Sequence, residues 1–136
     1  MASEVGYADA ALDYFLEACA VDLLDLHGNT ADGIHIASCG GTWLALVAGF
    51  GGLRDSDGEV RFSPRLPAEW ERLCFRVQVR GQLIEVDLTT TATTYRLIDG
   101  TGIVIEHFGE QTRLRRGAPV TRLAEAGEPE DLPLAA

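Results

Sequence analysis

Several side chains that could do chemistry together lie in one stretch of this 136-residue sequence, HGNTADGIHIASCGG, from residue 27 to residue 41. The stretch holds two His, one Asp, one Ser and one Cys together with four Gly, and apolar runs flank it on both sides. Residues of these types can form a metal site, an activated nucleophile or an anion-binding site. The same mixture can also be a plain turn into a helix, so the spacing has to decide.

The spacing argues against the metal site and the nucleophile. His27, Asp32 and His35 follow one another at steps of five and three residues, which matches none of the common zinc-ligand patterns. Ser38 lies outside a G-x-S-x-G elbow, and Cys39 lies in an apolar run typical of a buried, inert thiol. We therefore expect no metal site, and we assign no catalytic residue within this sequence.

An anion-binding site fits the pattern better. Ser38, Gly40 and Gly41 fall where an apolar helix is expected to begin. The first N–H groups of a helix have no partner inside it, and the helix dipole favours negative charge there. Glycines allow close approach of the backbone, Ser38 offers a hydroxyl donor, and His35 could add a charged donor. From the residues alone, a capping Ser38 and a glycine pair used for helix packing remain the simpler alternative.

The segments on either side of these residues have helical periods. Residues 8–26 place apolar side chains at three- and four-residue steps, with an acidic stripe on another face. Residues 36–50 are apolar on nearly every side and carry no charge, which is typical of a helix buried on most sides. A small domain with one other helix cannot surround such a segment. We therefore expect both helices to belong to a larger helical assembly.

Further along the chain the apolar residues alternate instead. Residues 73–79 and 83–88 alternate on either side of a short turn at Arg80-Gly81-Gln82, which predicts a β-hairpin. More short strands are expected at residues 94–98, 103–108, 112–117 and 119–123. Many short alternating strands joined by turns are typical of an antiparallel β-sandwich.

The expected organisation is therefore an α+β chain in three parts. Residues 1–57 hold the helices, residues 58–123 form the small antiparallel β-sandwich, and residues 124–136 form an acidic tail that we expect to be disordered.

Composition narrows the classes of partner. Twenty-one acidic residues against eleven basic ones give a formal net charge of −10, so no basic face is expected for nucleic acid. No apolar run is long enough to span a bilayer, and the N-terminal residues lack the basic start of a signal peptide. Three widely spaced cysteines without a C-x-x-C pair favour reduced, buried thiols, so we expect a cytoplasmic protein.

Four motifs between residues 32 and 70 resemble the C-terminal region of glycoside hydrolase family 65, which includes maltose, trehalose and kojibiose phosphorylases. They are Asp32-Gly33-x-His35, Ser38-x-Gly40-Gly41-Thr42-Trp43, Gly49-Phe50-x-Gly52-x-Arg54 and Pro64-Arg65-Leu66-Pro67-x-x-Trp70. The resemblance implies the last helices of an (α/α)6 barrel followed by a small C-terminal β-sandwich. It would also explain a helix that is apolar on every side, because other barrel helices would cover it.

The resemblance also implies a chemistry, namely phosphorolysis of an α-glucosidic bond with inversion. Family members use a Glu general acid that lies upstream in the barrel, and no Glu of this sequence matches its motif. What matches is the phosphate-binding segment, His35, Ser38, Gly40 and Gly41. The implied co-substrate is inorganic phosphate, with no other cofactor, and the chain alone is expected to be inactive. Arg54 is expected to be structural, and so is Arg65, both anchoring the barrel to the sandwich.

Two other functions stay open at this point. A hydrolase of the same family would use water in place of phosphate. A non-catalytic assembly module would associate through the apolar helix at residues 36–50, which needs either self-association or a missing barrel segment to cover it. The residues leave open which disaccharide would be the substrate and whether the chain is a separate gene product.

Overall fold

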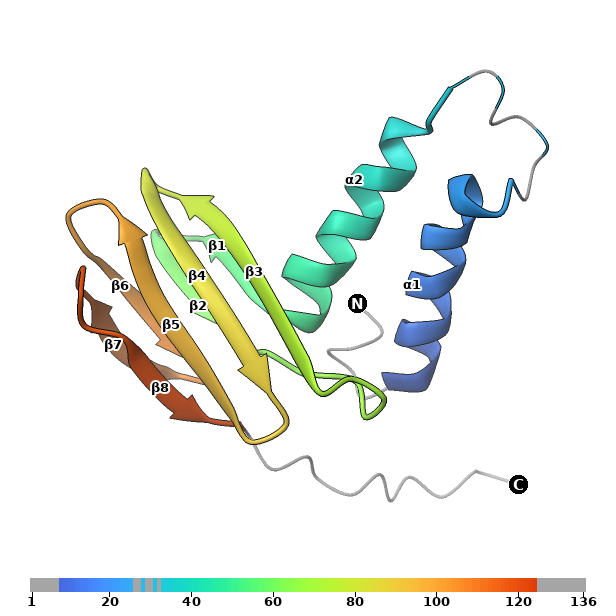
Figure 1. The fold of residues 1–136 in the computed structure, drawn as a ribbon. Helices are drawn as coiled ribbons and strands as arrows, with labels where there is room; N and C mark the ends of the chain where they lie inside the picture. Colours follow the sequence, from blue (N-terminus) through green and yellow to red (C-terminus); the bar gives the residue numbers. More distant parts are fainter. Residues whose placement is uncertain (1–7, 26–27, 29–30, 32, 125–136) are drawn as a thin grey trace.

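The computed structural model describes residues 8–25, 28, 31 and 33–124, which form a helical hairpin beside a two-layered β-sandwich (Figure 1). Helix α1 (Ala8–Leu23) is followed by α2 (Ile36–Leu44), which runs back alongside it and continues directly into a π-helix, η3 (Ala45–Phe50). The predicted bounds of 36–50 are thus confirmed, although the last six residues adopt the wider π geometry. His27, Asp32 and the tail from residue 125 lie outside the described residues.

Helix α1 is amphipathic at its start and exposed at its end. Leu12 is buried, while Asp13 and Glu17 are exposed, as the predicted stripes require. Leu23, which was expected on the apolar face, is 81% exposed. The described part of the chain offers only α2 as a helical neighbour, and one neighbour cannot cover the whole apolar face.

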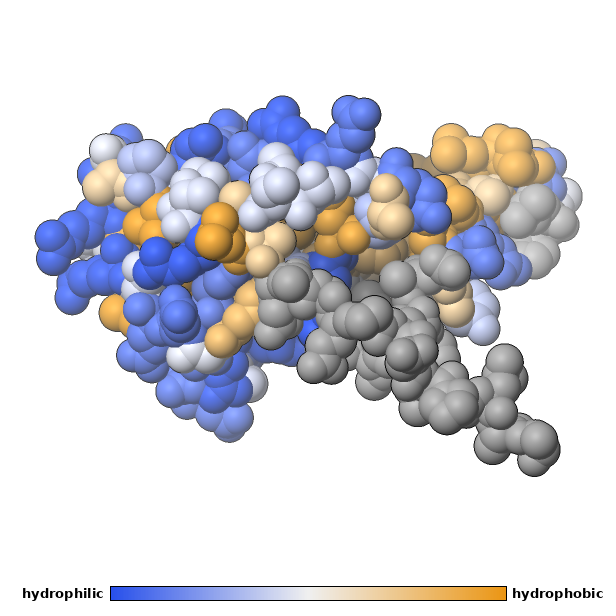
Figure 2. Space-filling view, turned by 90° about the horizontal axis from the view of Figure 1, so that it is seen from below, coloured by the Kyte–Doolittle hydropathy of each residue, from blue (hydrophilic) through white to orange (hydrophobic). Residues whose placement is uncertain are grey.

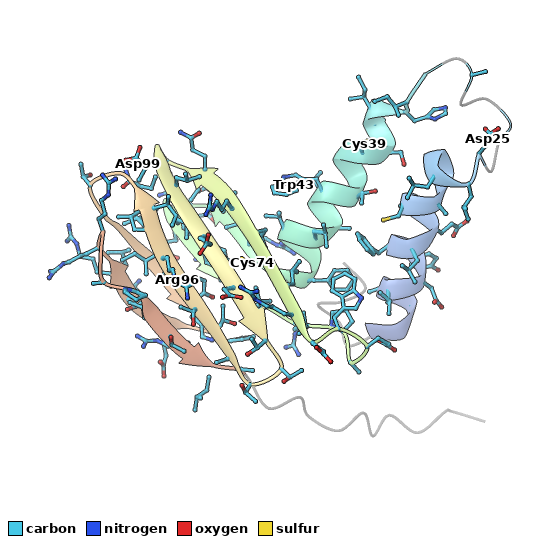
Figure 3. All side chains as sticks on the ribbon, viewed as in Figure 1. Asp25, Cys39, Trp43, Cys74, Arg96 and Asp99 are labelled. Carbon is cyan, nitrogen blue, oxygen red and sulfur yellow. The ribbon has the colours of Figure 1, made fainter. Side chains whose placement is uncertain are left out.

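Helix α2 shows the same shortage of neighbours more strongly, because none of its residues is buried. Ile36, Trp43 and Leu44 are exposed, and Figure 2 shows hydrophobic surface gathering at the end of the molecule where the helices lie. In Figure 3, Trp43 points from α2 away from α1. The prediction of a buried helix therefore fails for Ile36–Leu44, which only α1 and the sandwich flank among the described residues. It holds in part for η3, where Val47, Gly49 and Phe50 are buried.

The sandwich is built from two four-stranded sheets (Figure 1). The strands are β1 (Leu53–Ser56), β2 (Glu59–Phe62), β3 (Arg72–Val79), β4 (Gln82–Thr89), β5 (Ala92–Asp99), β6 (Ile103–His107), β7 (Glu110–Leu114) and β8 (Val120–Leu123). One sheet has the order β1-β2-β6-β7 and the other the order β3-β4-β5-β8. All neighbours are antiparallel except β2 and β6, which pair in parallel, so the expectation of a wholly antiparallel sandwich needs that correction.

The β1-β2 hairpin moves the expected domain boundary. Position 57, where we placed the end of the helical part, lies in the turn of this hairpin, with positive φ at Asp57 and Gly58. Strand β1 therefore belongs to the sandwich, which begins at Leu53. The hairpin is short and half charged, and this weakened the alternating signal of its two strands.

The core of the sandwich lies between the two sheets. On β4 the predicted inward residues Ile84, Val86 and Leu88 are all buried, and Tyr95 of β5 is fully buried beside them. The opposite sheet contributes Val60, Phe62, Ile105 and Leu114. Because side chains alternate across a strand, the charged residues between them lie on the outer face. Within the described residues, no helix is long and apolar enough to cross a membrane.

Candidate phosphate-binding segment

The start of α2 lies two residues earlier than the expected anion site. His35 is the N-cap residue, and its side chain makes no capping hydrogen bond to the helix. The helix begins at Ile36, and the N–H of Cys39 already donates to the carbonyl of His35 at 3.1 Å. The N–H groups of residues 36–38 therefore have no partner inside the helix. No acidic side chain stands in this first turn to repel an anion.

The two glycines lie inside the helix rather than at its start. An added Cβ would meet nothing within 4 Å at either Gly40 or Gly41, and both are exposed. The alternative of a glycine pair used for packing thus finds no partner among the described residues. Each Gly weakens a helix by about 1 kcal/mol relative to Ala. What the glycines supply is an open stretch of backbone on the outer face of α2.

Ser38 turns the other way, toward α1. Its hydroxyl donates to the carbonyl oxygen of Ala18 at 3.0 Å, and the contact is half-buried. Ser38 is therefore not the helix cap, and its hydroxyl joins the two helices. Of the four predicted residues, His35 is the half-buried N-cap of α2, and Gly40 and Gly41 are exposed within the helix. Ser38 contributes its backbone N–H to the first turn, while its hydroxyl faces α1.

Cys39 differs from its prediction in exposure. We expected a buried thiol, but Cys39 is exposed on α2, and Cys74 is exposed on β3. Cys39 is exposed because few helices surround α2. Cys74 is exposed because it lies on the outward side of β3. Figure 3 shows Cys74 and Arg96 on the outer face of the β3-β4-β5-β8 sheet.

At the other end of the helix, Arg54 anchors it to the sandwich as predicted. The Arg54 guanidinium donates to the carbonyl of Ala48 in η3 at 2.6 Å and to the carbonyl of Leu53 at 2.7 Å. The Arg65 guanidinium lies 5.9 Å from the ring centroid of Phe108, and the backbone N–H of Arg65 donates to the carbonyl of Phe50 in η3 at 2.8 Å.

An aromatic cluster that the sequence did not indicate lies at the same joint, the contact between the end of the α2–η3 helix and the sandwich. The rings of Phe15, Phe50 and Trp70 meet with centroid separations of 5.7, 5.5 and 5.0 Å. They come from α1, η3 and the segment before β3. Phe50 and Trp70 stand in two of the motifs that carry the family resemblance, but the triangle depends on contacts between distant parts of the chain.

Two polar groups with shifted pKa values lie in the sandwich, away from α2. The Tyr95 hydroxyl shares a 2.8 Å hydrogen bond with Nδ1 of His107, and burial raises the pKa of Tyr95 well above its usual range. The Arg72 guanidinium, 2.7 Å from Asp87, lowers the pKa of that carboxyl. Both arrangements fit structural roles, since each side chain is paired within the sandwich.

The described structure has two parts, a helical hairpin and a small sandwich, and both parts match one family. Residues 1–44 match the family model described as the glycosyl hydrolase family 65 central catalytic domain. Residues 53–114 match the model of the glycosyl hydrolase family 65 C-terminal domain. The chain belongs to glycosyl hydrolase family 65, and it spans the C-terminal region of that family.

Individual relatives agree with this assignment. An uncharacterized glycosyl hydrolase of Mycobacterium leprae is 47% identical over 89% of this chain, and an alpha,alpha-trehalose phosphorylase of Thermoanaerobacter brockii is 44% identical over 86%. A solved structure titled as a putative kojibiose phosphorylase from human microbiome covers 93% of the chain with a TM-score of 0.80 and 26% identity. The chain spans 16%, 15% and 19% of the lengths of these three proteins.

Proposed function

We propose that the protein carrying this chain is an inverting disaccharide phosphorylase of the cytoplasm, acting on an α-glucoside, and that the start of α2 contributes part of its phosphate site. The observation that carries the proposal is the start of α2 at Ile36, with no acidic side chain in its first turn and two exposed glycines after it, in a family 65 chain. Relatives bearing the names trehalose phosphorylase and kojibiose phosphorylase support the reaction class.

In the proposed reaction, an oxygen of inorganic phosphate attacks the anomeric carbon as the glycosidic C–O bond breaks. A glutamic acid from outside this chain gives its proton to the departing sugar oxygen. The product is β-glucose 1-phosphate, together with the second sugar. One catalytic carboxylate suffices, because phosphate brings its own charge and nucleophilicity, whereas an inverting hydrolase needs a second carboxylate to activate water. No metal or organic cofactor is part of the proposal.

The four proposed ligand residues would act in different ways. The N–H groups of the first turn, that of Ser38 among them, would donate to phosphate oxygens, favoured by the helix dipole. His35, at the N-cap position, would add a side-chain donor. Gly40 and Gly41 would leave room for phosphate or sugar against the helix. A contact from the Ser38 hydroxyl would require it to leave the carbonyl of Ala18.

The proposal also supplies a partner for the exposed side of α2. In the whole protein, other helices of an (α/α)6 catalytic barrel would cover Ile36, Trp43 and Leu44, which lie exposed in this chain. Burying large apolar side chains contributes roughly 1.5–3 kcal/mol each, so this surface favours association with such helices.

The test is the phosphate dependence of the whole protein on trehalose, kojibiose and maltose. The proposal expects cleavage of one of these sugars only when phosphate is present, with glucose 1-phosphate formed in equal amount to the released sugar. Release of free glucose at a rate unaffected by phosphate would favour the hydrolase and contradict the proposal. The isolated chain should release no glucose 1-phosphate, and robust release would contradict a general acid placed outside it.

A further inference from the structure

The sandwich supplies the donors that close the C-terminal end of the α2–η3 helix. The last carbonyl groups of a helix have no partner within it. The carbonyl of Phe50 accepts from the backbone N–H of Arg65 at 2.8 Å, and the carbonyl of Ala48 accepts from the Arg54 guanidinium at 2.6 Å. A positive charge at this end also interacts favourably with the helix dipole. Arg54 is the side chain that makes this contact from β1.

The residues at the joint around Arg54 are closely packed. A Cβ at Gly51 would lie 2.6 Å from Cζ of Phe75 and 2.6 Å from the carbonyl oxygen of Val47, so strand β3 touches the end of the helix directly. The Phe50 ring is held at the same level by its two aromatic neighbours. A tightly packed joint transmits a change of position instead of absorbing it.

The far end of the helix amplifies any change at this joint. From Ala48 to Ser38 the helix is about 15 Å long at ~1.5 Å per residue, so a tilt of about 10° would displace Ser38 by roughly 2–3 Å. A displacement of about 1 Å in a group that orients a reactant can lower a rate about 100-fold. The orientation set at Arg54 therefore matters most at the proposed phosphate segment.

We propose that Arg54 is a positioning residue for phosphate: its hydrogen bond to the carbonyl of Ala48 fixes the orientation of α2 on the sandwich, and with it the first-turn donors. The inference rests on the proposed function. Arg54 touches neither phosphate nor sugar in this account. It would give the C-terminal sandwich a role in binding the co-substrate, although the sandwich contributes no ligand.

The experiment uses the whole protein with Arg54→Lys, Arg54→Gln and the control Arg76→Gln. Arg76 lies on β3 and pairs with Glu85 on the outer face of the sandwich, so its loss removes one charge from the same domain without touching the helix. The KM values for phosphate and for the disaccharide are measured separately, together with kcat and the melting temperature.

We expect Arg54→Gln to raise the KM for phosphate at least tenfold more than the KM for the disaccharide. Arg54→Lys, which keeps one charged donor, should raise the same ratio two- to fivefold, and Arg76→Gln should leave it unchanged. Equal changes in the two KM values, or a lower melting temperature with both unchanged, would overturn the inference. If Arg54→Gln fails to fold, an unchanged ratio in Arg54→Lys overturns it. A wild-type protein that cleaves without phosphate would instead reject the proposed function itself.

Discussion

The hydroxyl of Ser38 donates to the carbonyl oxygen of Ala18 at 3.0 Å, and this hydrogen bond joins the two helices near the proposed phosphate segment. The carbonyl of Ala18 belongs to the middle of α1, where the helix ladder already uses one of its lone pairs. The bond therefore adds a tertiary restraint to secondary structure that exists without it. It holds the start of α2 against α1, as the aromatic cluster holds the other end of the helix.

Removing this hydroxyl should loosen α2 locally. We expect Ser38→Ala to lower the free energy of local opening of α2 by about 1 kcal/mol, the typical net value of a hydrogen bond. Hydrogen exchange of the α2 amides measures this opening. Ser56→Ala, on an exposed position at the end of β1, is the matched control and should leave α2 unchanged. Unaltered exchange in Ser38→Ala would show that the bond does not restrain the helix.

The buried pair of Tyr95 and His107 predicts a stability loss at neutral pH. Tyr95→Phe removes one partner of a buried hydrogen bond and should reduce the free energy of unfolding by roughly 1–3 kcal/mol. Tyr14→Phe is the control, because Tyr14 is 68% exposed on α1. Chemical denaturation at pH 7 measures both variants, and equal stabilities would contradict a structural role for the pair.

The same pair predicts that the free energy of unfolding falls as the pH rises in the alkaline range. Burial raises the pKa of Tyr95 in the folded protein, while the unfolded chain titrates near its ordinary value of about 10. The stabilisation is therefore complete below about pH 10 and declines as the pH rises further, because only the unfolded state releases the proton. Denaturation curves between pH 8 and 11 should converge for wild type and Tyr95→Phe. A constant difference across this range would speak against the shift.

Asp87 predicts a loss of stability as the pH falls, in the acid range. Its hydrogen bonds with Arg72 lower its pKa, so the carboxylate contributes stability above the unfolded value of about 3.9, and that contribution is lost as the pH falls through the folded pKa. Asp87→Asn should melt a few degrees below wild type at pH 7, with the gap closing in acid. Asp99→Asn, whose side chain is 74% exposed, should show neither effect. A gap that persists unchanged at pH 2 would contradict this origin.

The sandwich could be predicted strand by strand because one face of most strands is buried. Ile84, Val86 and Leu88 alternate with Glu85 and Asp87, and that period of two places them in the core without further information. Strands β1 and β2 were missed because four residues with several charges give too short a period to recognise. The parallel pairing of β2 with β6 depends on the path of the whole chain, which no local pattern contains.

The helix could be predicted in its bounds but not in its rotation. Residues 36–50 are apolar on all sides, so the sequence carries no stripe to indicate which face meets α1. That is why the direction of the Ser38 hydroxyl and the π register at Ala45–Phe50 became known only from the structure. The residue types at the start of α2 favour an anion site, because the chemistry of a helix start is local, and this site stays a prediction.

The most direct test of the phosphate segment is the KM for phosphate of Gly40→Ala in the whole protein. A Cβ at Gly40 meets nothing within 4 Å among the described residues, so the substitution should stabilise α2 by up to about 1 kcal/mol. If the segment binds phosphate, the same substitution should raise the KM for phosphate at least fivefold while the helix becomes more stable. A more stable α2 with an unchanged KM for phosphate would contradict a phosphate site at this end of the helix.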